Sequence, residues 1–201
     1  MKAEEILSSE DFKKCADFHG HICPGMALGY RAAQSGMAWL QKHRAVDEEL
    51  ITIVENNACG TDAVQVLTGC TFGKGNLIFK DYGKSVYTFL ERSEGRGVRV
   101  ALKPGAIEQT EEQRNLVDKI RKGTAKEEEK RRFDELHYQK TCEILEKPEE
   151  DLFSIREADR GLPPKAMVEA SLACDQCGEP TMASRLVEQD GRKVCLDCAQ
   201  N

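Results

Sequence analysis

Apolar residues follow two different spacings along this chain, and the change of spacing separates expected helices from expected strands. Apolar positions three or four residues apart are typical of helices with one buried face. Consecutive or alternating apolar residues bounded by glycine-containing turns are typical of strands. The first spacing predicts helices over residues 3–18, 24–43 and 60–69. The second predicts strands over residues 49–57, 76–82, 85–92 and 97–104, the last three as adjacent antiparallel strands.

Local signals support the first two helices. Ser9 precedes the acidic start of "EDF" and is a plausible helix cap, and Gly20 is where the first helix should end. Pro24 suits the first turn of the second helix, since its fixed φ and missing N–H cost nothing there. Glycine and alanine along that helix permit close packing by a neighbouring element.

The last part of the chain divides into three segments of different character. Residues 110–147 are strongly charged and predict two helices broken near Gly123, which we interpret as a solvated arm without chemistry. Residues 148–170 contain three prolines and predict a linker that touches the core through Leu152, Phe153 and Ile155. We therefore expect a core over residues 1–147, with the arm at about 110–147, then the linker 148–170 and a cysteine module over 171–201. The fold class is α+β, with a mainly antiparallel sheet, helices packed on it and a small C-terminal zinc ribbon.

Composition narrows the compartment and the partners. The chain has 201 residues, 40% hydrophobic and 32% charged, and a net charge of -6, which disfavours binding to nucleic acid. No apolar run is long enough for a membrane helix, and the charges in "MKAEEILSSEDFKK" argue against a secretion signal. We expect a reducing cytoplasm, where nine cysteines indicate metal ligands or reactive thiols rather than disulfides.

The C-terminal cysteines carry the strongest motif. Cys174 and Cys177 form one Cys-x-x-Cys pair, and Cys195 and Cys198 form another. Two residues between thiolates let a tight turn direct both at one tetrahedral zinc, and a hairpin around "QDGRK" can return the second pair. A redox pair or four unconnected core cysteines are the rival interpretations. Structural zinc is favoured, because so short a segment has too few apolar residues to fold unaided.

A second candidate site lies near the N-terminus, in "DFHGHICPG". His19, His21 and Cys23 alternate, so an extended segment presents all three from one side. Cys23 is expected at the start of a helix, where the dipole stabilises a thiolate. Cys59 is expected at another helix start, with Asp62 in its first turn. Two imidazoles and two thiols are a ligand set suited to zinc or a similar transition metal.

The same residues permit a plainer interpretation. His19 can be a histidine at a helix end, and Cys23 and Cys59 can be small buried side chains. Two short glycine-containing segments, "GKGN" and "DYGKS", suggest phosphate loops, but neither has the spacing of a P-loop or a dinucleotide fingerprint. From pattern alone, a metal site and simple packing therefore both stay open.

Three segments together resemble the FmdE family of formylmethanofuran dehydrogenase subunits. They are "FHGHICPGMALGYRAA", "ENNACGTDAVQVLTGCTFGKGNLIFKDYGKSVYTFLER" and the four-cysteine module. The resemblance implies an α+β core, a treble-clef-like zinc finger and assembly as homodimers. It also implies a second transition metal, zinc, in the core at His19, His21, Cys23 and Cys59.

Two classes of function follow from the resemblance. The first is a metal-binding subunit or accessory protein of a formylmethanofuran dehydrogenase-like molybdenum or tungsten oxidoreductase, with other oxidoreductase subunits as partners. The second is a free-standing small metalloenzyme that uses the Cys/His core metal on an unknown small molecule. A nucleic-acid regulator built on the zinc module is disfavoured by the negative net charge.

Overall fold

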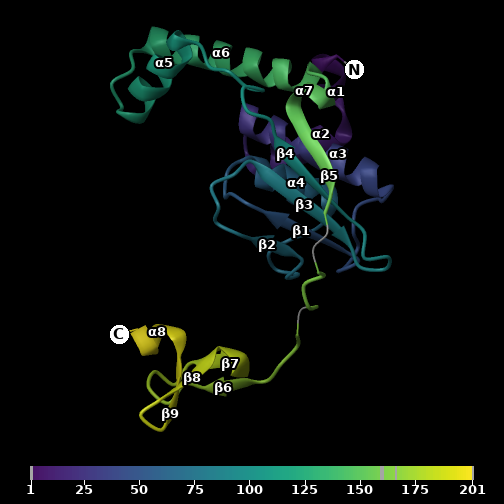
Figure 1. Ribbon diagram of the computed structural model, residues 1–201. Coiled ribbons are helices and arrows are strands. Elements are labelled where there is room, and N and C mark those ends of the chain that lie inside the picture. Colours follow the sequence, from purple (N-terminus) through teal and green to yellow (C-terminus); the bar gives the residue numbers. More distant parts are fainter. Residues whose placement is uncertain (1, 159–160, 166, 201) are drawn as a thin grey trace. The chain divides into compact units, whose positions relative to one another are not determined.

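A computed structural model describes residues 2–158, 161–165 and 167–200 (Figure 1). The chain separates into unit 1, residues 1–165, and unit 2, residues 166–201, which we describe individually. The helices of unit 1 are α1 (Ala3–Ser8), α2 (Glu10–His19), α3 (Pro24–Leu40), α4 (Gly60–Thr68), α5 (Glu111–Arg121), α6 (Glu127–Glu146) and α7 (Glu149–Leu152). Its strands are β1 (Leu50–Val54), β2 (Leu77–Phe79), β3 (Val86–Glu91), β4 (Gly97–Leu102) and β5 (Phe153–Glu157).

Unit 1 is built on a five-stranded sheet in the order β2-β1-β3-β4-β5. Every pair is antiparallel except β1 with β2, which confirms the mainly antiparallel α+β fold. The expectation that β2 neighbours β3 is wrong: β2 lies beyond β1 and runs parallel to it, with Thr52 opposite Leu77. The physical reason is α4, since parallel neighbours need a crossover connection, which is usually a helix.

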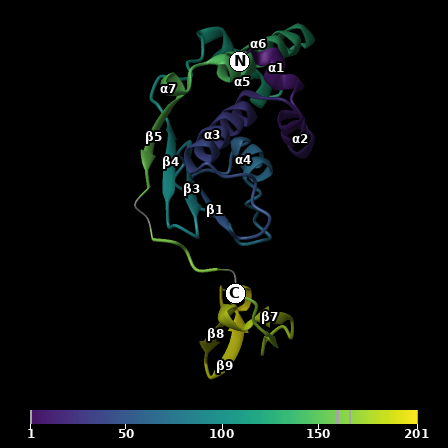
Figure 2. The ribbon, with the colours of Figure 1, turned by 90° about the vertical axis from the view of Figure 1, so that its right-hand side faces the viewer.

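Helices α3 and α4 form the layer behind the sheet (Figure 2). They approach closely where two glycines meet, since a Cβ built on Gly29 would lie 2.0 Å from the backbone oxygen of Gly60. Farther along α3, a Cβ on Gly36 would enter the ring of Phe89 in β3. The small residues of α3 are therefore what lets both α4 and the sheet pack directly against its backbone.

The segment expected as one N-terminal helix forms two. Ser9 has an extended backbone between α1 and α2, and its hydroxyl accepts the backbone N–H of Phe12 at 3.3 Å. This cap begins a new helix rather than continuing the old one. The expected end is confirmed, because Gly20 is left-handed at φ 89° and closes α2.

No helix among the described residues combines the length and apolar character that crossing a bilayer requires.

The charged segment forms α5 and α6, with a left-handed Gly123 between them as expected. Thr110 and Gln113 form a reciprocal cap at the start of α5. At the other end of the pair, the Arg31 guanidinium donates to the backbone carbonyls of Ile144 and Leu145, which ties the end of α6 to α3. The hairpin of α5 and α6 is thus attached to the core at the C-terminal end of α6.

Part of the expected linker belongs to the sheet instead. Residues 149–152 form α7, and β5 pairs with β4 so that Phe153 lies opposite Leu102 and Ile155 opposite Val100. Apolar and polar residues alternate through β5, which is a strand signal that the surrounding prolines obscure. Leu152 and Phe153 are both buried, so this segment completes the core of unit 1.

The described residues of unit 2 form two hairpins, a short 3-10 helix and a terminal α-helix. Its elements are β6 (Ser171–Ala173), β7 (Pro180–Met182), η1 (Ala183–Arg185), β8 (Leu186–Gln189), β9 (Arg192–Cys195) and α8 (Leu196–Gln200). The expected turn joins β8 to β9 through Asp190 and Gly191, both with positive φ, as a tight hairpin requires. Cys174 and Val194 are buried in unit 2, so its hydrophobic core is very small.

Candidate metal centre and its pocket

The alternating residues of the N-terminal motif converge as the sequence predicts. One ligand atom each from His19, His21 and Cys23 lies within 4.8 Å of the others. His19 ends α2, Cys23 caps α3, and the short connection between the helices carries His21. The two imidazole rings lie 4.4 Å apart between centroids. The junction between α2 and α3 therefore gathers two nitrogens and a sulfur on one side.

His19 is oriented as a metal ligand would be. Its Nδ1 lies 2.7 Å from an Oδ2 of Asp62 in the first turn of α4, and its Nε2 lies 3.7 Å from the Cys23 sulfur. A carboxylate on one ring nitrogen directs the lone pair of the other towards a metal. Tetrahedral zinc with ordinary bond lengths would hold a nitrogen and a sulfur about 3.6 Å apart. The observed separation therefore fits a shared zinc ion.

Cys23 is a helix cap, as expected, but its thiol is not made acidic by that position. Its sulfur accepts the backbone N–H of Met26 at 3.3 Å. Burial nevertheless raises the pKa of Cys23 to about 11, and the backbone donors at the start of α3 offset only part of that effect. The expected thiolate stabilisation is therefore outweighed by desolvation, and a nearby cation is needed for this thiol to lose its proton.

Cys59 joins the group from a separate element. It is the residue immediately before α4, as the sequence predicts, and a Cβ built on Gly25 would lie 3.7 Å from its sulfur and 4.0 Å from the sulfur of Cys23. The same Cβ would lie 3.2 Å from the Cβ of Cys59, so glycine at this position lets Cys59 approach the start of α3 closely. The structure thus brings all four predicted residues together, and three of them form the tightest set.

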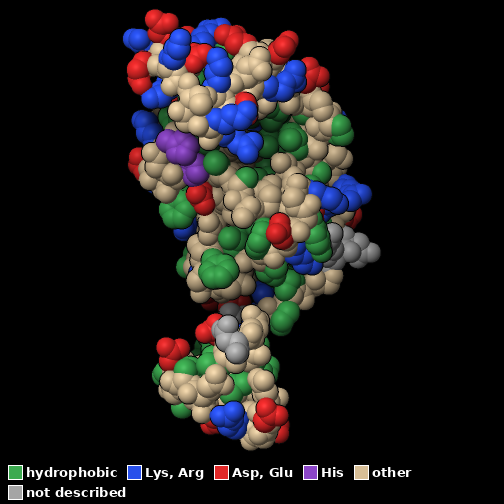
Figure 3. Space-filling model, turned by 90° about the vertical axis from the view of Figure 1, so that its left-hand side faces the viewer, with side chains coloured by type: hydrophobic (Ala, Val, Ile, Leu, Met, Phe, Trp, Pro, Cys, Tyr) green, Lys and Arg blue, Asp and Glu red, His purple; other side chains and the backbone are tan. Residues whose placement is uncertain are grey.

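A pocket of about 320 Å³ opens beside these residues. Figure 3 shows histidine side chains next to a hollow with hydrophobic walls, under a strongly charged surface. His21, Cys23 and Cys59 line one side of the pocket. The opposite side comes from the charged segment and its connection, through Ile107, Leu116, Val117, Phe133 and Leu136. The interpretation of residues 110–147 as an arm without chemistry therefore misses its contribution to this pocket.

Sequence reasoning also missed the polar groups that the segment supplies. His137 and Lys140 on α6 and the amides of Gln109 and Gln113 complete the lining. Burial lowers the pKa of His137, and the nearby imidazole of His21 lowers it further. The sequence contains one signal for this contribution. His137 lies one helical turn after Phe133, on the apolar face of α6.

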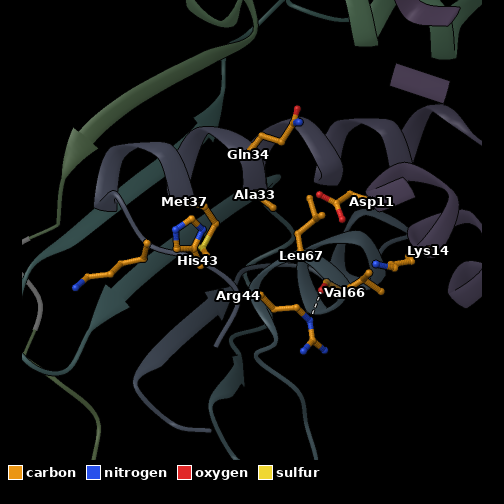
Figure 4. A pocket seen from close by; sticks show the side chains of 10 residues that line it. Asp11, Lys14, Ala33, Gln34, Met37, His43, Arg44, Val66 and Leu67 are labelled. Carbon is orange, nitrogen blue, oxygen red and sulfur yellow. Dashed lines mark hydrogen bonds between the residues drawn. The ribbon is translucent and has the colours of Figure 1, made fainter. Parts of the chain in front are cut away.

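A larger cavity of about 660 Å³ lies between α2, α3 and α4 (Figure 4). Its basic residues are already engaged by other groups. Lys14 pairs with Glu10 and Lys42 pairs with Glu91, each at 2.7 Å. The Arg44 guanidinium donates to the backbone oxygen of Val66 at 2.9 Å. The lysines and the arginine of this cavity are therefore paired within the chain.

In unit 2 the four cysteines form a second cluster, with their sulfurs within 4.8 Å of one another. Backbone N–H groups donate to the Cys174 sulfur and lower its pKa to about 6. The neighbouring thiols raise the pKa of Cys198 to about 12. The backbone therefore favours a thiolate at Cys174. Four thiolates together need a bound cation to offset their mutual repulsion.

Comparison with known proteins assigns both units. Residues 18–154 match the family described as FmdE, molybdenum formylmethanofuran dehydrogenase operon. Residues 169–200 match the prokaryotic dksA/traR C4-type zinc finger, which together with the cysteine cluster indicates a zinc site.

Two individual proteins are also similar. A probable S-adenosyl-L-methionine-binding protein of Archaeoglobus fulgidus is 36% identical over 195 residues, covering 92% of this chain, and the chain spans about half (51%) of that relative's length. The crystal structure of a tungsten formylmethanofuran dehydrogenase FmdE-like protein from Syntrophus aciditrophicus superimposes with a TM-score of 0.63 at 26% identity. That match covers 96% of this chain and 94% of the other.

Proposed function

Because the chain belongs to the FmdE family, we propose that it is a metal-binding subunit or accessory protein of a formylmethanofuran dehydrogenase-like molybdenum or tungsten oxidoreductase. The observation that carries this proposal is the cluster of His19, His21 and Cys23 beside a pocket. Three protein ligands leave one tetrahedral position for a small molecule, which is the arrangement of functional rather than structural zinc sites.

The residues have distinct roles in this centre. His19 and Cys23 would hold the metal, with His21 as the third ligand and Asp62 fixing the orientation of His19. Cys59, beside Cys23, would be a fourth ligand or a contact for the bound molecule. A metal here, zinc by its ligand set, supplies a Lewis acid that polarises a bound ligand or acidifies a bound water.

A second candidate is a free-standing small metalloenzyme that uses the same centre. The pocket favours it, because a purely docking subunit has no need of a cavity beside its metal. The name of the Archaeoglobus fulgidus relative adds S-adenosyl-L-methionine as a molecule to test in this pocket. Genes for pterin-enzyme subunits next to this gene would support the accessory role, whereas turnover by the isolated chain would support the second candidate.

The core metal can be tested by titrating zinc into the full chain and measuring bound metal in each variant. We expect a metal in unit 1 in addition to the one in unit 2. Cys23→Ser should abolish the former, and Asp62→Asn should weaken it by about 10–100-fold, because the His19 imidazole loses its anionic partner. Metal in unit 2 should be unaffected by either change.

Asp81→Asn provides the matched control, since Asp81 is an exposed carboxylate in a loop. It should bind metal as the parent does. If Cys23→Ser and Asp62→Asn also bind zinc in unit 1 as tightly as the parent, the residues serve only packing and the proposal fails.

We also propose that the chain forms a homodimer. The family resemblance supports this. The charged helical segment of residues 110–147 supports it as well, because it has too little apolar surface to belong entirely inside the core of one chain. Light scattering in moderate salt should give about twice the 22.5 kDa chain mass. A monomer mass throughout the micromolar range would refute the dimer.

A further inference from the structure

The pocket beside the core cluster has two chemically different walls. Metal-ligating side chains occupy one wall, at the starts of α3 and α4. The other wall is apolar and is carried mainly by α5 and α6. A ligand that fills this pocket must therefore meet both a coordination site and a hydrophobic surface.

The apolar wall is a built surface, and part of it is aromatic. Leu116 is 7% exposed although α5 is otherwise strongly charged, because α5 packs against α6 at this point. The ring of Phe133 lies 4.7 Å from that of His137, tilted by 31°, and both side chains line the pocket. A flat apolar group can therefore be stacked here and removed from water.

The charges around the pocket favour an anion at the metal end. None of the described residues that line the pocket is acidic. Among them, Lys140 is the one lysine or arginine. Lys140 is 14% exposed and its Nζ lies 2.5 Å from an Oε of Glu143, so its charge is largely balanced. A divalent metal held by two neutral imidazoles and the Cys23 thiolate would keep one net positive charge, and the Asp62 carboxylate behind His19 reduces it further. The open position would therefore suit one singly charged group rather than a polyanion.

We propose that the pocket binds a small organic monoanion with an apolar body the size of an aromatic ring. With Cys59 as a contact and not a fourth ligand, the anionic group takes the open coordination position beside His21 and Cys23. The body packs on Phe133 and the apolar residues of α5. The inference rests on the proposed core metal. It assigns the hairpin of α5 and α6 as the part of the chain that selects the ligand.

The test compares benzoate with acetate, which share a carboxylate and differ in the ring. The full chain is loaded with cobalt(II), whose visible bands report changes in its ligands. The bands of the four-cysteine site should stay constant and serve as an internal reference. We expect benzoate to perturb the core bands at concentrations at least about tenfold lower than acetate, because its ring is buried against the apolar wall.

Two variants locate the ring. Phe133→Ala should reduce the preference for benzoate severalfold while leaving acetate binding unchanged, and Leu136→Asp should abolish it by placing a charge in the pocket. Tyr138→Ala is the matched control, since this aromatic residue of α6 is 53% exposed and lies outside the pocket. Far-UV circular dichroism verifies that each variant keeps its helices.

The outcomes separate this inference from the proposed metal centre. If no cobalt bands beyond those of the four-cysteine site appear, the metal centre itself is refuted. If the core bands appear but benzoate binds no more tightly than acetate, the centre stands and the ligand class is wrong. A preference for benzoate that survives both Phe133→Ala and Leu136→Asp would place the ring elsewhere and overturn the role of the hairpin.

Discussion

Cys174→Ser is expected to release zinc from unit 2 and to unfold residues 171–200, while unit 1 keeps its structure. Cys174 is the cysteine whose sulfur receives backbone N–H bonds from both halves of the unit, from Gln176 and from Cys195. Few side chains of unit 2 are buried, so metal binding supplies most of its folding free energy. Structural zinc sites of this kind contribute roughly 10–16 kcal/mol.

The measurement combines zinc release to a chromogenic chelator with limited proteolysis of the full chain. Cleavage should be confined to the C-terminal segment in the variant. Cys142→Ser is the matched control, because Cys142 is a half-buried cysteine of α6 outside both clusters. A Cys174→Ser protein that retains its zinc and its resistance to protease would contradict the zinc-dependent fold.

The second large effect is expected from Gly29→Ala. The added methyl group would lie 2.0 Å from the carbonyl oxygen of Gly60 and 2.3 Å from its Cα, and a backbone cannot turn aside as a flexible side chain can. Helices α3 and α4 must separate, which we expect to cost about 3 kcal/mol or more. Since Cys59 immediately precedes Gly60, core metal binding should weaken as well.

Urea unfolding followed by circular dichroism measures the loss of stability, and zinc titration measures the loss of core metal. Gly73→Ala is the matched control, since a Cβ at Gly73 would meet nothing within 4 Å. It should unfold at the parent's midpoint. An unchanged midpoint for Gly29→Ala would show that the two helices are not in the close contact described.

Local signals in the sequence were sufficient for much of the fold and for the two candidate clusters of metal-ligating residue types. Gly20 ends α2 and Cys23 begins α3, because the backbone conformations they need are set by the residue and its immediate neighbours. The same holds for the Asp190–Gly191 turn of unit 2. Alternation alone was enough to predict that His19, His21 and Cys23 share one side of the chain.

Partners distant in the sequence were decided only by the tertiary structure. The hydrophobic pattern predicts the wrong neighbour for β2, because strand pairing depends on the path of the connecting helix. It also misses β5, because prolines near this strand indicate a linker. Desolvation of Cys23 outweighs the helix dipole, and burial depends on everything that packs around the residue.

The sequence by itself determined the four-cysteine motif of the zinc module and the alternation of His19, His21 and Cys23, because each depends on spacing along the chain. Its hydrophobic pattern was enough for the α+β class. Only the tertiary structure placed Asp62 on His19 and brought Phe133 and His137 to the pocket. The apolar positions of α5 and α6 are sparse among charges, so their pattern shows that one face is buried but not what it faces. What it faces is decided by the packing of the whole chain around the sheet.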